Sequence, residues 1–266
     1  MTIIISSTDS YQDCWNPFFS LFEKFIEDIS IFKIYLITDN LVYNDHSFVK
    51  TIKSSDSGKI LAWSDRIKFA LKQIDDESFL LLMDDYFLYS KINYEKLKSL
   101  NSILNSNDKL GSIKIVNHHN NNVLKSEYKN LKTIKKNSSY RVTLQPTMWK
   151  KKYLNEILVE GENPWHFEIL GTLRSFFVDK SLLVTSNEWN AINKIYLTNG
   201  AGGIKKGKWI FSEFRKIESI LGKKIITSRG FFSEKSKFFS KLDMIRNTIS
   251  LNVLFRSFKF ILKKIY

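Results

Sequence analysis

A short apolar run that ends in two adjacent carboxylates constrains the fold of this chain more than any other stretch. Residues 79–83 are all apolar, and Asp84 and Asp85 follow them directly. Five consecutive apolar residues predict a strand that is buried on both faces of a sheet. A buried carboxylate costs several kcal/mol unless it is paired or holds a metal. Ligands of open α/β sheets bind beyond the carboxyl ends of the strands, so we expect Asp84 and Asp85 to face a ligand, with a metal-bound diphosphate as the working hypothesis.

The segments around this run alternate between strand and helix patterns. Strands are predicted at residues 2–6, 33–39, 48–52, 79–83 and 112–116, and helices at residues 18–29, 63–74 and 93–104. This alternation is typical of an α/β fold with a Rossmann-like, mostly parallel sheet flanked by helices. Ser64, or a residue just before it, is expected to cap the helix at 63–74.

The pattern is looser after residue 117. Residues 126–139 are basic and predicted to be solvated, residues 140–145 predict a strand that Pro146 ends, and residues 148–158, 165–177 and 209–221 predict helices. We therefore divide the chain into a main domain at residues 1–225 and a basic, amphipathic helical tail at residues 226–266.

Composition favours a well-packed protein of a reducing compartment. Hydrophobic residues make up 43% and aromatic residues 14% of the 266 residues, which supports a sizeable core and excludes a disordered chain. The single cysteine, Cys14, excludes an internal disulfide. No signal-peptide pattern opens the chain, and no apolar run reaches the roughly 20 residues that cross a bilayer. We expect the protein to be cytoplasmic.

The basic charge of the chain points to an anionic partner. The formal net charge is +14 and the pI is about 9.6. Nucleic acid, anionic lipid and phosphate-bearing substrates all fit this balance. The basic residues concentrate in loops and in the tail, and no recognised nucleic-acid-binding motif is present. Nucleic-acid binding therefore stays as an alternative, and lipid and phosphate are favoured.

Four motifs occur in an order that resembles a known group of enzymes. They are Trp63-Ser64-Asp65-Arg66, residues 81–88 (Leu-Leu-Met-Asp-Asp-Tyr-Phe-Leu), residues 144–149 (Leu-Gln-Pro-Thr-Met-Trp) and residues 164–168 (Pro-Trp-His-Phe-Glu). Together they resemble bacterial GT-A-like glycosyltransferases of surface-polysaccharide (capsule and O-antigen) gene clusters, over about residues 1–215. The resemblance implies a catalytic domain with a nucleotide-sugar-binding half at 1–117 and an acceptor half at 118–225. It also implies transfer of a sugar to a hydroxyl of a glycan, which we expect to be lipid-linked. A non-catalytic partner of a polysaccharide synthase is a further alternative.

The resemblance implies a divalent metal, Mn²⁺ or Mg²⁺, at the paired acids. GT-A enzymes use an Asp-x-Asp motif to hold the metal on the donor diphosphate, and Asp84 and Asp85 match it with the second acid adjacent. Which Asp is the ligand stays open. A hard cation suits carboxylate oxygens and would neutralise the leaving diphosphate, so Asp85 is also assigned to catalysis. Turn acids that cap the next segment are the alternative.

Further donor-site candidates lie at strand ends, at a helix start and in a basic loop. The residues predicted to bind the donor are Ser6, Asp39, Asp65, Arg66, Asp84, Asp85, Lys205 and Lys208. Arg66 can hold a phosphate with two hydrogen bonds, and an ordinary surface arginine beside a helix N-terminal acid is the alternative. The Gly/Lys loop at residues 200–208 could close over a diphosphate or be a plain basic loop, and it lacks the spacing of a P-loop.

The acceptor side is predicted from a carboxylate and from flat aromatic rings. The resemblance makes Glu168 the candidate general base of an inverting transfer, with Glu162 in reserve; an exposed helix acid is the alternative. The predicted acceptor-binding residues are Gln145, Trp149 and Trp165, and Trp189 is a further aromatic candidate. Core packing is the alternative for each tryptophan. His118 and His119 lack a third ligand nearby and favour a loop over a metal site.

The tail from about residue 235 combines basic and apolar residues. Eight Lys and Arg residues stand there against Glu234 and Asp243, among many Phe, Ile and Leu residues. A basic helix with an apolar face predicts binding to an anionic membrane surface, here the inner face of the cell membrane. A helix folded back on the catalytic domain, or a helix that forms an oligomer, is the alternative.

Overall fold

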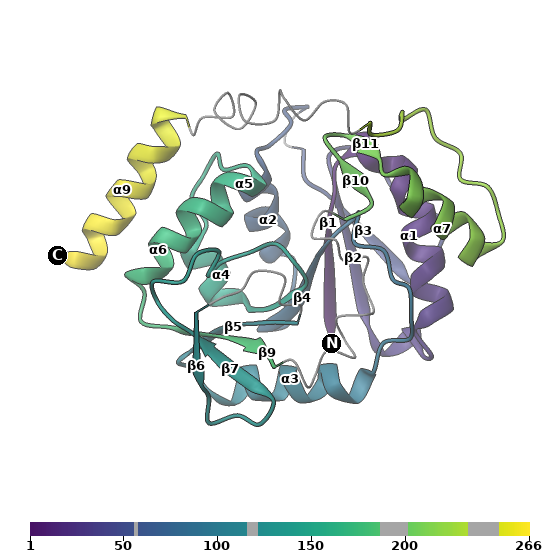
Figure 1. Ribbon diagram of the computed structural model, residues 1–266. Helices are drawn as coiled ribbons and strands as arrows, with labels where there is room; N and C mark the ends of the chain where they lie inside the picture. The colour runs from purple at the N-terminus through teal and green to yellow at the C-terminus, as the bar shows by residue number, and fades with distance from the viewer. Residues whose placement is uncertain (56–57, 116–121, 187–201, 234–249) are drawn as a thin grey trace.

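A nine-stranded sheet forms the centre of the fold in a computed structural model that describes residues 1–55, 58–115, 122–186, 202–233 and 250–266 (Figure 1). The strand order is β3-β2-β1-β4-β8-β5-β9-β7-β6. The strands are β1 (Thr2–Ser6), β2 (Lys33–Thr38), β3 (Val49–Lys53), β4 (Ser78–Met83), β5 (Leu110–Lys114), β6 (Val123–Lys125), β7 (Leu131–Ile134), β8 (Thr147–Lys150) and β9 (Ser181–Thr185). Strands β3, β2, β1 and β4 are parallel neighbours, and β7 and β8 run against the other strands of this sheet.

Helices cover both faces of the sheet. The principal helices are α1 (Gln12–Phe25), α2 (Trp63–Leu71), α3 (Tyr94–Ser106), α4 (Lys151–Ile157), α5 (Pro164–His166), α6 (Thr172–Phe176), α7 (Phe211–Leu221) and α9 (Leu251–Ile265). Apolar residues of α1, α3 and α7 fill the core on one face, and those of α2 and α4 fill the core on the other. A π-helical turn, η3 (Phe167–Gly171), joins α5 to α6. A small hairpin of β10 (Ile204–Lys205) and β11 (Lys208–Trp209) lies beside the sheet.

Strand β4 is buried on both faces, as its sequence predicts. Leu80 and Leu82 belong to the core under α1, whereas Phe79 and Leu81 belong to the core under α2. The alternation follows from the two-residue period of a strand. The expected fold class, a Rossmann-like and mostly parallel α/β sheet flanked by helices with a C-terminal helix, is confirmed by this topology.

Several predicted elements shift, and one is wrong. Residues 140–145 are not a strand; they form an irregular segment in which Tyr140 has a φ of 47°, a left-handed conformation that a strand excludes. The strand, β8, follows Pro146 instead. Met148 and Trp149 belong to the cores on opposite faces of the sheet, which is the two-residue alternation of a strand. The prediction of a helix over residues 148–158 overlooked this alternation. The helix there begins only at residue 151.

Smaller differences concern element bounds. Helix α1 begins at residue 12 rather than 18, and α2 begins after Ala62 without a side-chain cap. Residues 131–134 of the segment predicted to be solvated form β7, and β9 was not predicted. The division of the main domain at residue 117 stays a prediction. Strand β8, which follows residue 117, lies between β4 and β5 in the same sheet.

None of the helices in the described part of the chain is long and apolar enough to cross a membrane. Helix α9 packs beside α6, where the Nη1 atom of Arg174 donates to Ser257 at 2.6 Å. The folded-back alternative for the tail therefore holds for the inner face of α9. The part of the tail at residues 234–249, together with His118, His119 and Trp189, lies outside the described residues.

Candidate functional site

A cavity of about 630 Å³ lies beyond the carboxyl ends of β1 and β4. The predicted site residues that line it are Ser6, Arg66, Asp84, Asp85, Gln145, Trp165, Glu168 and Lys205. They come together because β1 and β4 are parallel and in register, with Ser6 opposite Met83. Antiparallel β8 begins at the same edge, since Thr147 pairs with Leu81, and this places Gln145 beside the strand-end acids.

Asp84 is buried and held by the residue that follows β1. Its Oδ2 atom accepts a hydrogen bond from the Ser7 hydroxyl, and Ser7 in turn accepts one from Trp15 Nε1 at 2.6 Å. Burial, with the Asp85 charge second, raises the pKa of Asp84 well above its usual range. Because the negative charges of Asp84 and Asp85 repel each other, a cation bound between them would stabilise the doubly ionised pair.

Asp85 is covered by the backbone of the hairpin segment. The Gly203 amide donates to the Asp85 carbonyl at 2.8 Å, and a Cβ atom at Gly202 would collide with the Asp85 carboxylate. Gly202 has a φ of 64°, a left-handed conformation that suits glycine and permits this close approach. Burial raises the pKa of Asp85 to about 7, although hydrogen bonds from the Asp85 and Ile204 amides act in the opposite direction.

Arg66 forms a buried ion pair at the same edge. Its Nη1 atom lies 3.0 Å from Asp39 Oδ1 and 2.6 Å from the carbonyl oxygen of Ser7, and the side chain is 7% exposed. It is therefore not an ordinary surface arginine. The Nε atom of Arg66 is buried and has no partner among the described residues. Asp39, which was predicted to bind the donor, does not line the cavity, and it orients the Arg66 side chain through this ion pair.

Glu168 lies on the η3 turn with one oxygen already engaged. Its Oε1 atom accepts hydrogen bonds from the Thr143 hydroxyl and from the Leu144 amide, both at 2.8 Å. The carboxylate is half-buried and lines the cavity. Lys114 at the end of β5 is 2% exposed, and burial lowers its pKa to about 7 while the nearby Glu168 charge acts in the opposite direction. Glu168 is thus a positioned carboxylate rather than an exposed helix acid.

Two acceptor-side candidates lie at the cavity. Gln145 is 4% exposed, and its Oε1 atom has no hydrogen-bond partner among the described residues. A buried acceptor without a donor is costly, so a ligand hydroxyl would stabilise it. Trp165 is 64% exposed, which leaves its ring available to a ligand. These features suit a hydroxyl-rich ligand.

Other predicted residues lie away from the cavity. Trp149 is buried in the core, and Lys208 is exposed on β11 and does not line the cavity. Asp65 accepts from the Gly161 amide at 3.2 Å and so holds a neighbouring loop. Glu162 is fully buried in a two-oxygen ion pair with Arg174 at 2.7 and 2.8 Å, which makes it a structural acid. The Lys205 ammonium lies 4.8 Å from the centre of the Phe232 ring, in a hairpin rather than a loose loop.

Sequence reasoning missed an arginine that ties the hairpin to α1. Arg229 Nη2 lies 2.8 Å from Asp13, Nη1 donates to the Gly207 carbonyl at 2.8 Å, and the guanidinium lies over the Tyr11 ring. The charge of Arg229 acts against the burial that raises the pKa values of Asp84 and Asp85, without reversing it. No local signal marks it, because its partners are about 20 and more than 200 residues away. Ser7 could have been found, since it directly follows a strand.

The donor set fits a divalent metal with few protein ligands. No group of three or more His, Cys, Asp or Glu side chains in the described residues could hold an ion alone. Burial raises the pKa values of both Asp84 and Asp85, and a bound cation would favour their ionised forms. Mg²⁺ and Mn²⁺ are commonly held by one or two carboxylates together with substrate phosphates and waters. The pair therefore fits such an ion when it arrives with a diphosphate.

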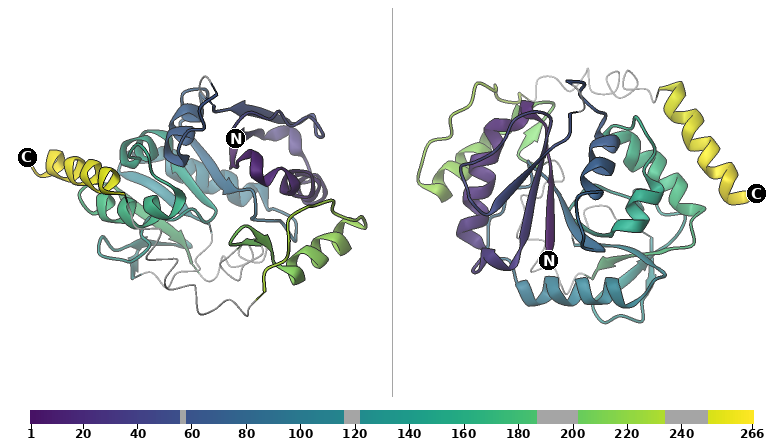
Figure 2. Two further views of the ribbon diagram at one scale, coloured as in Figure 1. Left: turned by 90° about the horizontal axis from the view of Figure 1, so that it is seen from above. Right: turned by 180° about the vertical axis from the view of Figure 1, so that it is seen from behind.

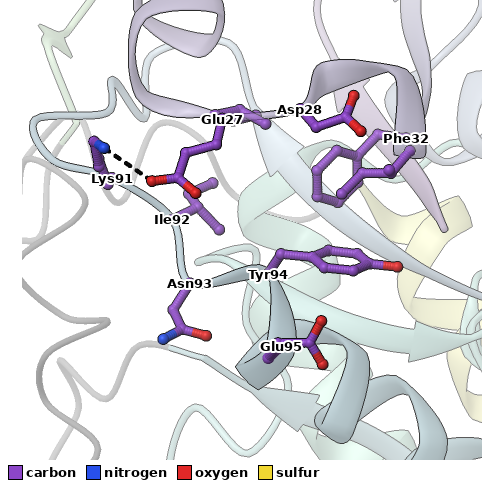
Figure 3. A pocket seen from close by; sticks show the side chains of 10 residues that line it. Glu27, Asp28, Phe32, Lys91, Ile92, Asn93, Tyr94 and Glu95 are labelled. Atoms are coloured by element: carbon purple, nitrogen blue, oxygen red, sulfur yellow. Dashed lines mark hydrogen bonds and ion pairs between the residues drawn. The ribbon is translucent and has the colours of Figure 1, made fainter.

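A second cavity lies at the opposite edge of the sheet, before β2 (Figure 3). Phe32 and Tyr94 meet there with ring centroids 5.7 Å apart, and Lys91 lies 2.8 Å from Glu27. This ion pair is exposed, and none of the predicted site residues lines the cavity. Of these two cavities, the one beyond the carboxyl ends of β1 and β4 is therefore the candidate functional site.

Comparison with solved structures finds distant neighbours, which include TarS and a mannosyltransferase. Residues 1–349 of Staphylococcus aureus TarS are 16% identical, with 99% of this chain and 80% of that chain covered and a TM-score of 0.47. The same TarS segment in complex with UDP gives 16% identity, 94% and 75% coverage and a TM-score of 0.49. The mannosyltransferase PcManGT from Pyrobaculum calidifontis, in complex with GDP-Man and Mn²⁺, gives 9% identity, 77% and 57% coverage and a TM-score of 0.46.

Comparison with protein-family models and with curated proteins found no match. At these identities and TM-scores the solved structures carry no argument about the activity of this chain. A functional assignment has to come from the side chains of the cavity.

Proposed function

We propose that this chain is a glycosyltransferase that moves a sugar from a nucleotide-sugar donor to a hydroxyl of a lipid-linked surface glycan. One observation carries the proposal: a single cavity holds a pair of strand-end acids, the buried Asp84 and the half-buried Asp85, and a buried arginine together with a separately positioned carboxylate, Glu168. The first group suits a diphosphate, and the second suits a hydroxyl. Both are needed for glycosyl transfer.

The donor diphosphate would bind at the strand-end residues. Arg66 lines the cavity and is held by its ion pair with Asp39, so its guanidinium is oriented for a phosphate before the donor binds. Asp84 and Asp85 would hold Mn²⁺ or Mg²⁺, and this ion neutralises charge on the diphosphate when it is bound. Ser6 lines the same edge, where its hydroxyl accepts from Trp63 Nε1 at 3.0 Å.

The acceptor hydroxyl would lose its proton to Glu168. The Oε1 atom of Glu168 is engaged by Thr143 and Leu144, so Oε2 is the atom that takes the proton. As the acceptor oxygen forms a bond to the anomeric carbon, the bond from that carbon to the diphosphate oxygen breaks and the nucleoside diphosphate leaves. Attack from the face opposite the leaving group inverts the anomeric configuration. Gln145 and Trp165 would orient the acceptor glycan.

We place the enzyme at the inner face of the cell membrane, in contact with anionic lipid through the tail. Helix α9 contains Arg256, Lys259, Lys263 and Lys264 and no acidic residue. Its buried residues are Val253, Ser257 and Ile261, so one face packs on the protein and the rest faces outward. A basic amphipathic helix of this kind binds the headgroup region of a bilayer. A lipid-linked acceptor would be found there.

A thermal-shift screen of nucleotide sugars, with and without Mn²⁺ or Mg²⁺, tests the proposal. A matching donor at about 100 times its Kd should raise the Tm by roughly 5 °C or more, and the metal should increase the shift. Transfer from that donor to a lipid-linked glycan extract should follow. If no nucleotide sugar changes the Tm under any metal condition, the donor-site assignment is wrong.

A further inference from the structure

The helical segment that carries Glu168 has an exposed apolar stripe along its outer side. Four large side chains at a spacing of about one helical turn are 46–64% exposed: Trp165, Ile169, Leu173 and Phe176. We call this set the α5–α6 stripe. Residues three or four apart share one face of a helix, so the side chains form one continuous surface. Contiguous exposed apolar surface of this kind marks an interaction site.

Helix α9 has a second stripe of the same character. Its exposed apolar side chains are Leu251, Leu254, Phe255, Phe258, Leu262 and Ile265, with exposures of 41–84%. We call this set the α9 stripe. Because Val253, Ser257 and Ile261 already pack on the protein, the α9 stripe is not required to hold the helix in place. Burying it would need a partner outside the described chain.

The helices that carry the two stripes are neighbours. Arg174, which lies in α6, donates to Ser257 of α9 at 2.6 Å, and α9 lies along the outer side of α6 in the views of Figures 1 and 2. Two further contacts hold α9: Arg256 donates to the Glu160 carbonyl at 2.9 Å, and Lys264 pairs with Glu156. These contacts fix the rotation of α9 and leave the α9 stripe exposed on a helix that lies beside α6.

Charge identifies the partner as an anionic bilayer. Lys259 and Lys263 are exposed and form no ion pair with the described residues, and the helix contains no acid that could balance them. Basic side chains beside a broad apolar face match the headgroup layer of an anionic membrane, where the ammonium groups meet lipid phosphates and the apolar groups enter the acyl boundary. Trp165 at the rim is a residue type that favours this interface.

We propose that the α5–α6 stripe and the α9 stripe together form one docking surface for an anionic lipid bilayer. The proposal deepens the proposed function and rests on it in one respect, the delivery of a lipid-linked acceptor. Trp165 belongs both to the stripe and to the cavity lining, and Glu168 follows it on the same helical segment. Docking through this surface therefore sets the cavity mouth at the membrane, where the acceptor hydroxyl can reach Glu168 without leaving the bilayer surface.

Co-sedimentation of the full chain with vesicles of equal parts phosphatidylcholine and phosphatidylglycerol tests the surface. Replacing three residues of the α5–α6 stripe, Ile169→Gln, Leu173→Gln and Phe176→Gln, should lower the partition coefficient about tenfold or more. Leu254→Gln, Phe258→Gln and Leu262→Gln should have a similar effect. A control variant with equally exposed apolar residues elsewhere, Val42→Gln, Ile60→Gln and Leu124→Gln, should change it less than about twofold.

Two results would overturn the docking surface. One is wild-type vesicle binding by the α5–α6 variant when its Tm matches that of the control variant. The other is a dimer in solution, measured by light scattering without lipid, that the same substitutions convert to a monomer, because the stripes would then cover each other in two copies. The nucleotide-sugar thermal shift is measured on the same proteins. Loss of that shift concerns the proposed function, whereas loss of vesicle binding with the shift intact supports the docking surface alone.

Discussion

The two sides of the cavity differ in how their polar groups are held. On the side proposed for the donor, Arg66 pairs with Asp39, and Asp84 accepts from Ser7, all within segments that follow parallel strands. On the side proposed for the acceptor, Glu168 has one engaged oxygen, and the Oε1 atom of Gln145 has no partner among the described residues. Arg66 and Asp84 are therefore each held by a protein partner before a ligand binds, while Gln145 has a side-chain oxygen that no described residue satisfies.

The difference follows from the sheet. Parallel strands in register bring their carboxyl ends to one line, so short side chains there meet neighbours at fixed distances. The acceptor side is built by the irregular segment before β8 and by the η3 turn, where backbone geometry is less regular. π-helical turns often occur at functional sites. A rigid donor edge and a more permissive acceptor edge would suit an enzyme that keeps its donor and admits a long glycan.

The largest expected effect is on the donor side. The double substitution Asp84→Asn and Asp85→Asn should lower kcat/KM for transfer by about 10³-fold or more, because the diphosphate loses its charge-neutralising site. The protein should be at least as stable in urea at pH 7.5, since a buried and a half-buried acid with raised pKa values are removed. Transfer assays and urea unfolding provide the two measurements.

A second adjacent acid pair gives a matched control. Asp75 and Asp76 lie after α2, outside the cavity, and Asp76 accepts from the Thr2 hydroxyl at 2.5 Å. Changing both to Asn should leave transfer within about twofold and lower stability instead, because a hydrogen-bonded surface acid is lost. Equal loss of transfer in the two double variants would contradict the special role of the strand-end pair.

On the acceptor side, Glu168→Gln should lower kcat by about 10³-fold, which is the usual range for a general base. Gln keeps an oxygen that can accept from Thr143 and Leu144, so the fold and the donor-induced thermal shift should not change. Single-turnover transfer with saturating donor is the measurement. If the variant instead loses donor binding while its chemistry is intact, Glu168 belongs to the donor side and the comparison fails.

The grouping of side chains at the proposed donor edge was largely predictable from sequence, because strand ends are local features. The apolar run 79–83 predicts β4, and parallel pairing then places Ser6, Asp84 and Asp85 together. The acceptor edge was not, since residues 140–150 combine a left-handed Tyr140, Pro146 and a strand of only four residues. There the resemblance to known enzymes, rather than periodicity, indicated Glu168.

Long-range contacts explain what the sequence could not show. The ion pair between Arg229 and Asp13 joins residues 216 apart, and it fixes the hairpin that covers Asp85. Neither residue stands out in its local segment. The role of Trp149 was also undetermined, because a tryptophan beside a buried strand is equally compatible with a ring that meets sugar and one that fills a core.

A smaller effect should separate two buried arginines. Arg66→Lys should weaken nucleotide-sugar binding about tenfold, because an ammonium cannot donate to Asp39 and to a phosphate in the fixed geometry of a guanidinium. Arg174→Lys is the matched control, since Arg174 forms a buried ion pair with Glu162 away from the cavity. It should cost stability without changing the donor Kd. Calorimetric titration with the donor found in the screen checks both, and equal Kd values for wild type and Arg66→Lys would remove Arg66 from the donor site.

The smallest effect concerns a buried cation on the acceptor side. Burial lowers the pKa of Lys114 to about 7, whereas the unfolded chain keeps this ammonium near pKa ~10.4. Between those values the unfolded chain binds more protons than the folded chain, so the free energy of unfolding should rise with pH. Lys114→Met removes this contribution. Between pH 7.5 and 8.5 the wild type should gain about 1 kcal/mol relative to the variant in urea unfolding. Parallel pH profiles for the two proteins would mean that Lys114 keeps its charge, and the acceptor side would then hold a fixed cation beside Glu168, as organised as the donor edge.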